Sequence, residues 1–491
     1  MLAPTEPDHE VIVVGTGFAG LGMAIKLMEA GVDFLVLEQA DSIGGTWREN
    51  TYPGCACDVQ SHLYSFSFAP NAEWTRMFAP QPEIRAYLER CADDFAVRGD
   101  IRLGARVTHA EWDEIAGVWR VEVNGEETVT ARVLVPALGA LSRPAIPEIP
   151  GRERFAGTAF HSAEWDHDYD FAGKRVAVIG TGASAIQFVP QIAKAAAHVD
   201  LYQRTPPWIV PKPDRPITRA ERRLFRAVPA AQRLYRRAIY WALESRVLGF
   251  VVHPRLMKGA ELYAKHHIRK QISDPELRRK VTPDYTIGCK RVLISDDYYP
   301  ALARPHVDVI TDDVAEITER GVVTGDGVER PVDAIVYGTG FRVQELLTPL
   351  TVVGRDGTDL NETWATGGLQ AYKGTAVAGF PNLFLLLGPN TGLGHSSMVY
   401  MAEAQIAYVL DALRTMRGPM EVTAEAQAAY NEEIQLKLGD AVWANGGCRS
   451  WYLDAGGRNT TLWPGFTFQF RRATARFDAE SYRAVRTTVA A

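Results

Sequence analysis

The segment EVIVVGTGFAGLGMAIKLMEAG, residues 10–31, joins an apolar run to a glycine-rich turn and a helical pattern. The apolar run predicts a buried strand, and the second half carries apolar side chains at helical spacing. Between them, Gly15, Gly17 and Gly20 let the backbone turn sharply and let its N–H groups approach a pyrophosphate. The next strand ends with Glu38, whose carboxylate can accept hydrogen bonds from a ribose. The unit predicts a dinucleotide-binding domain that takes FAD or NAD, because this acid repels the 2′-phosphate of NADP.

A second copy of the pattern, KRVAVIGTGASAIQFVPQIAKAAAHVDLYQRTPPW, covers residues 174–208. Here the second strand ends at Arg204 and Thr205 instead of at an acid. A guanidinium can bind a 2′-phosphate through two N–H groups. The copy therefore predicts an NADPH site; the alternative is an exposed arginine without a ligand. Its predicted binding positions are Gly180, Gly182, Ala185, Arg204 and Thr205. Two such units with opposite charge predict an oxidoreductase in which a flavin receives hydride from NADPH.

Residues 44–58, GGTWRENTYPGCACD, follow the first unit and supply glycines, aromatic rings and an acid. Gly44 and Gly45 free the backbone near the cofactor, and Trp47 and Tyr52 offer flat faces to a flavin ring. Gly45, Thr46 and Trp47 are predicted to bind the cofactor. Asp58 could lie where the polar edge of that ring is bound. The alternative is a surface loop with aromatic residues in the core.

Length and composition limit the class of protein. A chain of 491 residues predicts at least two domains, and 46% hydrophobic with 23% charged residues is typical of globular proteins. A formal charge of −6 gives no field that attracts nucleic acid. The amino terminus lacks the basic start of a signal peptide and no run reaches a membrane span, so we expect no transmembrane segment and a cytoplasmic location. The five cysteines predict neither a disulfide framework nor a metal site.

The link between the two units reads FAGTAFHSAEWD, residues 155–166. It resembles the fingerprint of type I Baeyer-Villiger monooxygenases, and residues 44–58 resemble the second motif of that family. Relatives that oxidise nitrogen or sulfur usually lack the final Trp and acid. A His and a Trp on such a link could couple cofactor position to domain rotation, although the His could equally be a structural, hydrogen-bonded residue. The fixed positions of the motif are Phe155, Gly157, His161, Trp165 and Asp166.

The resemblance also assigns residues in the carboxyl half. It implies that Arg291 is the active-site arginine and that Lys290 joins Arg204 at the 2′-phosphate. It further implies that Asn390 lies near the flavin and that Trp451 lies on the nicotinamide side of the pocket. The chain departs from the cyclic-ketone type after Trp451, so no substrate preference is carried over.

Chemistry gives a reason for the arginine. Reduced flavin adds O2 at C4a, and the peroxide must stay deprotonated to attack a carbonyl carbon. A fixed cation such as Arg291 favours that anion and then the charged adduct, and Asp58 could hold the cation in place. The predicted catalytic pair is therefore Arg291 and Asp58, without a metal.

The sequence thus predicts an α/β protein with two Rossmann-like domains and a helical insertion. We expect the flavin domain at 1–141 and 342–491, a linker at 142–154, and the NADP domain at 155–341. Residues 210–285 should form helices that cover the substrate site; a membrane-surface face is the alternative. The predicted activity converts a ketone and O2 to an ester or lactone with FAD and NADPH. The alternatives are an N- or S-oxygenating flavin monooxygenase, a flavin disulfide reductase and a non-catalytic flavin-binding protein.

Overall fold

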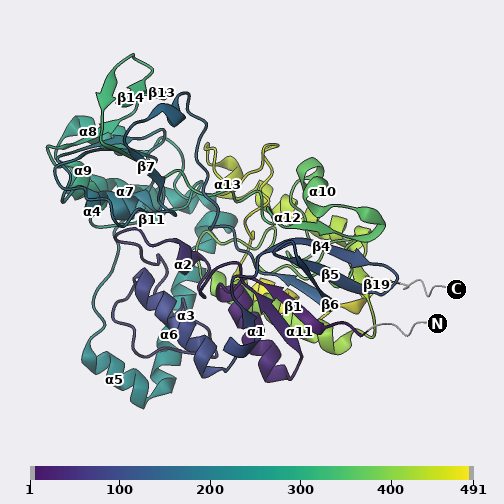
Figure 1. Cartoon of the computed structure of the whole chain (residues 1–491). Coiled ribbons are helices and arrows are strands. Elements are labelled where there is room, and N and C mark those ends of the chain that lie inside the picture. The colour runs from purple at the N-terminus through teal and green to yellow at the C-terminus, as the bar shows by residue number, and fades with distance from the viewer. Residues whose placement is uncertain (1–5, 486–491) are drawn as a thin grey trace.

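Two sheets of mainly parallel strands, each with its own helices, organise the chain (Figure 1). The computed structural model describes residues 6–485. The first sheet has seven strands, in the order β17 (Thr351–Val353), β4 (Val107–Asp113), β5 (Val118–Val123), β6 (Glu127–Pro136), β1 (His9–Val14), β2 (Phe34–Leu37) and β3 (Ile101–Arg102). Because β17 pairs with β4, residues beyond 350 return to the unit that the amino terminus began.

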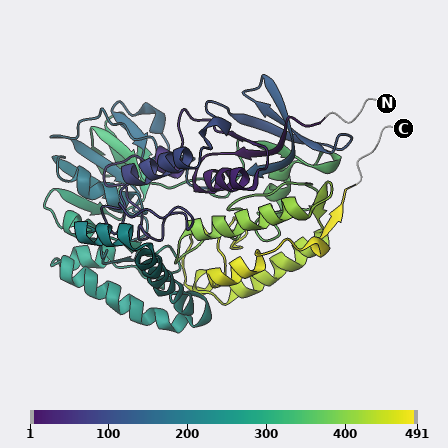
Figure 2. The same cartoon turned by 90° about the horizontal axis from the view of Figure 1, so that it is seen from below.

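Helix α1 (Phe18–Ala30) connects β1 to β2 and packs against α11 (Met398–Thr415), as the view from below shows (Figure 2). The chain turns at Gly104 (φ +65°) between β3 and β4. The other helices of this unit are α2 (Thr46–Glu49), α3 (Gln81–Asp94), α10 (Leu360–Gly367), α12 (Ala424–Gly439), α13 (Val442–Asn445) and α14 (Thr467–Ala473).

The second sheet has five parallel strands, in the order β12 (Val307–Ile310), β9 (His198–Tyr202), β8 (Arg175–Ile179), β16 (Ala334–Tyr337) and β7 (Thr158–His161). Helix α4 (Ala185–Ile192) follows β8 and packs beside α9 (Tyr298–Leu302). Three short antiparallel strands extend this unit at the top of Figure 1: β13 (Val314–Ile317), β14 (Gly321–Thr324) and β15 (Glu329–Pro331). The two-sheet α/β architecture agrees with the prediction.

A helical insertion separates β9 from β12. It contains α5 (Arg219–Ala227), α6 (Pro229–Glu244), α7 (Met257–Gln271) and α8 (Pro275–Val281). The expectation that its aromatic residues are covered is wrong for two of them: Trp241 is 57% and Tyr263 is 55% exposed. Trp241 packs against the exposed Phe468 instead, at a centroid distance of 5.9 Å. Among residues 6–485, no helix is long and apolar enough to cross a bilayer.

An aromatic cluster joins the two units. Trp165, at the end of the linking motif, packs against Phe188 of α4 and against Tyr52 of the first unit, with centroid distances of 5.4 and 6.5 Å. The Tyr52 hydroxyl donates to the Gln187 side chain at 2.9 Å. These contacts bury Trp165 to 8% exposure, so the position of one unit on the other depends on this indole.

We predict that Trp165→Ala lowers the free energy of unfolding by about 3–5 kcal/mol, because a buried indole is lost and a cavity remains. Urea unfolding followed by circular dichroism measures this change. Trp165→Phe is the matched control, since it keeps an aromatic ring at the same point and should lose less than half as much. Equal losses in the two variants would contradict a packing role for this side chain.

Candidate active site

In the first glycine loop, backbone segments lie very close to one another. A Cβ on Gly20 would lie 1.9 Å from the carbonyl oxygen of Gly15, and a Cβ on Gly45 would lie 2.8 Å from Cα of Gly17. The loop that carries Gly45 and Thr46 therefore lies against the first glycine turn. The Glu38 carboxylate accepts from the Thr16 N–H at 2.9 Å and from the Thr16 hydroxyl at 2.6 Å. The acid thus stands beside the turn, as a ribose ligand requires.

The second glycine loop has the same construction. Gly180 has φ +110°, and its Cβ would lie 2.4 Å from the carbonyl oxygen of Gly338. Gly182 precedes α4, and the fully buried Ala185 begins that helix. A larger residue would clash at Gly180, whereas a Cβ on Gly182 would meet only the Gly338 carbonyl oxygen at 3.9 Å. The backbone of this turn can therefore approach a phosphate group closely.

Two cations meet beside the second loop. Arg204 is exposed at the end of β9, and Thr205 accepts at its carbonyl oxygen from the Thr181 hydroxyl at 3.1 Å. Partial burial lowers the pKa of Lys290, and the positive charge of Arg204 lowers it further. The charge of Arg204 thus acts on Lys290, although the two residues are far apart in the sequence. A pair of neighbouring cations at a glycine loop is an arrangement that attracts a phosphate.

Arg291 and Asp58 form an ion pair across the two units. The Nε and Nη2 groups of Arg291 both donate to Asp58 Oδ2, at 2.8 and 2.5 Å. The Nη1 group donates to the Leu393 carbonyl oxygen at 3.3 Å. The carboxylate of Asp58 raises the pKa of Arg291, so the guanidinium stays charged. The side chains remain 29% and 30% exposed, which keeps a charged face accessible to a reactant.

Known proteins resemble this chain in sequence and in fold. Residues 12–227 match the family model for pyridine nucleotide-disulphide oxidoreductases. A Baeyer-Villiger monooxygenase of Pseudomonas aeruginosa is 56% identical over 495 residues, covering 99% of this chain and 94% of that protein.

This chain belongs to the Baeyer-Villiger monooxygenase family. It is a flavin-dependent monooxygenase, and the sequence prediction of this enzyme class is confirmed. Among solved structures, an oxidised steroid monooxygenase bound to NADP matches with a TM-score of 0.87 and 32% identity, over 97% of this chain and 99% of that one. The complex of OTEMO with FAD and NADP matches with a TM-score of 0.88 and 27% identity, over the same shares.

Two residues that the sequence predicts near the cofactor, Trp47 and Asn390, make hydrogen bonds to other residues of the protein. Trp47 is buried, and its indole N–H donates to the Tyr64 hydroxyl at 3.1 Å. The Asn390 amide donates to the carbonyl oxygens of Asn459 and Leu462, at 2.8 and 3.1 Å. Asn390 therefore fixes the carboxyl-terminal loop beside the first unit. Trp451, on the same loop, is 44% exposed.

Tyr452 is a neighbour of Arg291 that the sequence reasoning missed. Its side chain is fully buried, and burial raises its pKa to about 12, while the adjacent guanidinium of Arg291 partly offsets that rise. The only sequence signal was its position directly after the predicted Trp451. A neutral phenol thus stands beside the charged pair.

The linking motif lies mainly in the second sheet. Gly157 is required because a Cβ there would lie 2.5 Å from the carbonyl oxygen of Asp333, and Phe155 packs on the core of this sheet. His161 is fully buried at the end of β7, and its Nδ1 accepts from the Ala163 N–H at 3.1 Å. Asp166 accepts from the Asp168 N–H at 3.0 Å and so stabilises a surface turn. The motif builds structure around the aromatic cluster.

The cysteines require a correction. Cys289 and Cys448 form a disulfide across 159 positions, where the sequence analysis expected none. The expectation failed because it used spacing along the chain, and the fold brings these distant residues together. Cys55 and Cys57 are free and buried, and burial raises the pKa of Cys55 to about 12. Protonated thiols are poor nucleophiles, which argues against the disulfide-reductase alternative.

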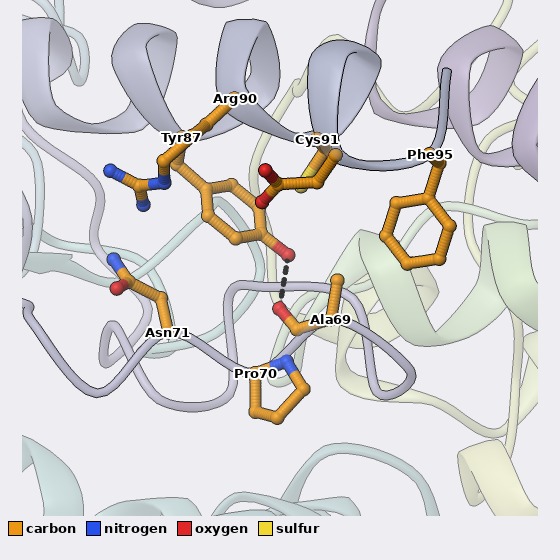
Figure 3. A pocket seen from close by; sticks show the side chains of 8 residues that line it. Ala69, Pro70, Asn71, Tyr87, Arg90, Cys91 and Phe95 are labelled. Atoms are coloured by element: carbon orange, nitrogen blue, oxygen red, sulfur yellow. Dashed lines mark hydrogen bonds between the residues drawn. The ribbon is translucent and has the colours of Figure 1, made fainter. Parts of the chain in front are cut away.

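An open cavity of about 280 Å³ lies between α3 and the loop at residues 69–71 (Figure 3). The Tyr87 hydroxyl donates to the Ala69 carbonyl oxygen at 2.7 Å across its floor. Burial raises the pKa of Cys91, which also lines it, to about 11. None of the predicted site residues lines this cavity.

We predict that His161 makes the protein less stable in acid. Burial lowers its pKa from 6.5 to about 4. Between these values the unfolded chain binds a proton that the folded chain does not, so stability is lost as pH falls below about 6.5. His161→Gln should remove about 2 kcal/mol of the difference in unfolding free energy between about pH 7.5 and about pH 5.

Urea unfolding of both proteins at the two pH values measures this effect. Burial also lowers the pKa of His62 to about 4, so part of the slope should persist in the variant. A slope that is unchanged in His161→Gln would show that His161 titrates normally.

Proposed function

We propose that this monooxygenase uses FAD, NADPH and O2 to insert one oxygen atom beside the carbonyl group of a small-molecule ketone. The product is an ester or a lactone. The ion pair of Arg291 with Asp58 carries this proposal, because it holds a permanent cation against the loop that follows the first glycine unit. Bound FAD would supply the redox chemistry, taking hydride from NADPH and passing electrons to O2.

Arg291 provides electrostatic stabilisation. Its guanidinium cannot lose its proton at any working pH, since Asp58 holds the pKa above the usual range. A fixed cation favours negative charge on an attacking oxygen and on the adduct with the carbonyl carbon. Asp58 fixes two donors of the guanidinium and leaves Nη1 on the Leu393 carbonyl, so the cation has little freedom to turn away.

Arg204 and Lys290 would bind the 2′-phosphate of NADPH. The exposed guanidinium of Arg204 can donate two parallel hydrogen bonds, and the Lys290 ammonium supplies a second charge beside it. Glu38 would bind a ribose hydroxyl of FAD at the first loop. Trp451 would contact the nicotinamide side from its exposed loop. Because NADPH is regenerated inside cells, the proposal places the enzyme in the cytoplasm.

The domain roles follow from these sites. We propose that residues 1–141 and 342–491 bind FAD and that residues 155–341 bind NADPH. Residues 142–154 link them. His161 and Trp165 would couple the two by their packing at the junction, and neither would transfer a proton.

We predict that Arg291→Ala keeps bound FAD and NADPH oxidation but lowers ester formation by about 10²–10³-fold, because charge stabilisation is lost. Product analysis by mass spectrometry over linear, cyclic and aromatic ketones, together with the flavin absorbance spectrum, measures both. Arg132→Ala is the matched control, since Arg132 pairs with Glu10 on the surface and is 53% exposed. Unchanged ester formation in Arg291→Ala would remove this residue from the reaction.

We also predict that Arg204→Ala raises the KM for NADPH at least about tenfold while the KM for NADH changes little, because NADH lacks the 2′-phosphate. Steady-state kinetics with each coenzyme measures the two constants. Lys290→Ala should act in the same direction. An equal rise for both coenzymes would mean that the phosphate binds elsewhere.

A further inference from the structure

The disulfide connects two segments that both end at the candidate active site. Cys289 directly precedes Lys290 and Arg291 in the chain, and Cys448 lies three positions before Trp451 and four before Tyr452. Tyr452 in turn is fully buried, and the charge of Arg291 partly offsets the rise of its pKa. The disulfide therefore links the segment that carries Arg291 to the segment that carries Trp451 and Tyr452, close to the guanidinium.

Few other contacts join these two segments. The Thr286 N–H donates to the Gly446 carbonyl oxygen at 2.9 Å. A Cβ on Gly446 would lie 2.5 Å from Cβ of Cys289, so the segments touch closely at this point. Beyond it, part of the loop is exposed: Gly447 and Arg449 are exposed and Trp451 is 44% exposed, whereas Tyr452 is buried. The disulfide is thus the main tie between this loop and the arginine segment.

We propose that Cys289 and Cys448 form a peroxide-responsive disulfide that positions the loop of Trp451 and Tyr452 against Arg291. This inference rests on the proposed function. In the oxidised enzyme the loop stays closed on the site, and NADPH oxidation is coupled to ester formation. In the dithiol enzyme the loop loosens, water enters, and electrons from NADPH are lost to O2 as hydrogen peroxide.

Hydrogen peroxide is also the oxidant that closes the bond. Uncoupled turnover converts NADPH, H⁺ and O2 to NADP⁺ and H2O2. The Cys448 thiolate, which is partly exposed, attacks one peroxide oxygen; the O–O bond breaks, hydroxide leaves and a sulfenic acid forms. The Cys289 thiolate then attacks that sulfur, the S–S bond forms and the S–O bond breaks. Two thiols are oxidised and H2O2 is reduced to two waters, once the two hydroxides take up the two thiol protons.

The same chemistry explains why the pair can exist in a reducing compartment. Disulfides there are typically transient and redox-sensing, and a thiol pool reopens them. The free cysteines compete poorly for peroxide, because burial raises the pKa of Cys55 to about 12 and that of Cys91 to about 11. The enzyme would therefore restore its own coupling when peroxide leaks from the site.

The first test does not depend on activity. The purified holoenzyme is treated with dithiothreitol or with hydrogen peroxide, and peptides are mapped by mass spectrometry without reduction. We expect the linked peptides of Cys289 and Cys448 after peroxide and free thiols after dithiothreitol. Trypsin should cut after the exposed Arg449 roughly fivefold faster in the reduced protein, because the loop opens more often.

The second test measures ester formed per NADPH consumed, and hydrogen peroxide released. This ratio should fall roughly threefold or more on reduction of the wild type, because small displacements at an active site are costly. Cys289→Ser and Cys448→Ser should show the low ratio at the outset and no response to dithiothreitol. Cys91→Ser is the matched control and should respond like the wild type.

The outcomes separate the inference from the function. Free thiols at both positions after peroxide, or the same ratio and the same cleavage rate in both redox states, would overturn the inference. An absence of ester in every sample would instead contradict the proposed function, while peptide mapping and cleavage after Arg449 would still decide whether the bond fixes the loop.

Discussion

The ion pair of Arg291 with Asp58 is the interaction on which the rest of the site depends. It joins residues 233 positions apart, one beside the second unit and one on the loop after the first. Two charges at 2.5 Å from each other in a half-buried place are stable only while both are present, since removal of one leaves the other unpaired. The two units must therefore hold these loops together, and the Leu393 carbonyl and Tyr452 complete the same enclosure.

Charge also separates the two glycine loops, which are otherwise alike. Glu38 takes hydrogen bonds from the first loop and leaves an acid there, whereas Arg204 and Lys290 bring two cations to the second. Under the proposed function, a phosphate on the ribose would be repelled at the first position and attracted at the second, so that one fold used twice could receive two different dinucleotides.

Local patterns predicted local structure well, and distant contacts poorly. The strand and helix over residues 10–31 follow from apolar spacing, and the roles of Gly15, Gly20 and Gly180 follow from the steric needs of a turn. The pairing of Arg291 with Asp58 was proposed through resemblance to a family, since no spacing rule reaches across the chain. The disulfide and the contact of Tyr452 with Arg291 were missed for that same reason.

The linking motif combines a rigid part with an adaptable one. Gly157 and His161 are fixed in the second sheet by close backbone contact and by β pairing, so this end cannot shift without breaking the sheet. Trp165 reaches the first unit through aromatic packing on Tyr52. Apolar contacts are non-directional and tolerate small rotations, whereas the hydrogen bonds of Arg291 do not. The packing at Trp165 therefore tolerates small rotations that the hydrogen bonds of Arg291 to Asp58 and of Tyr52 to Gln187 resist.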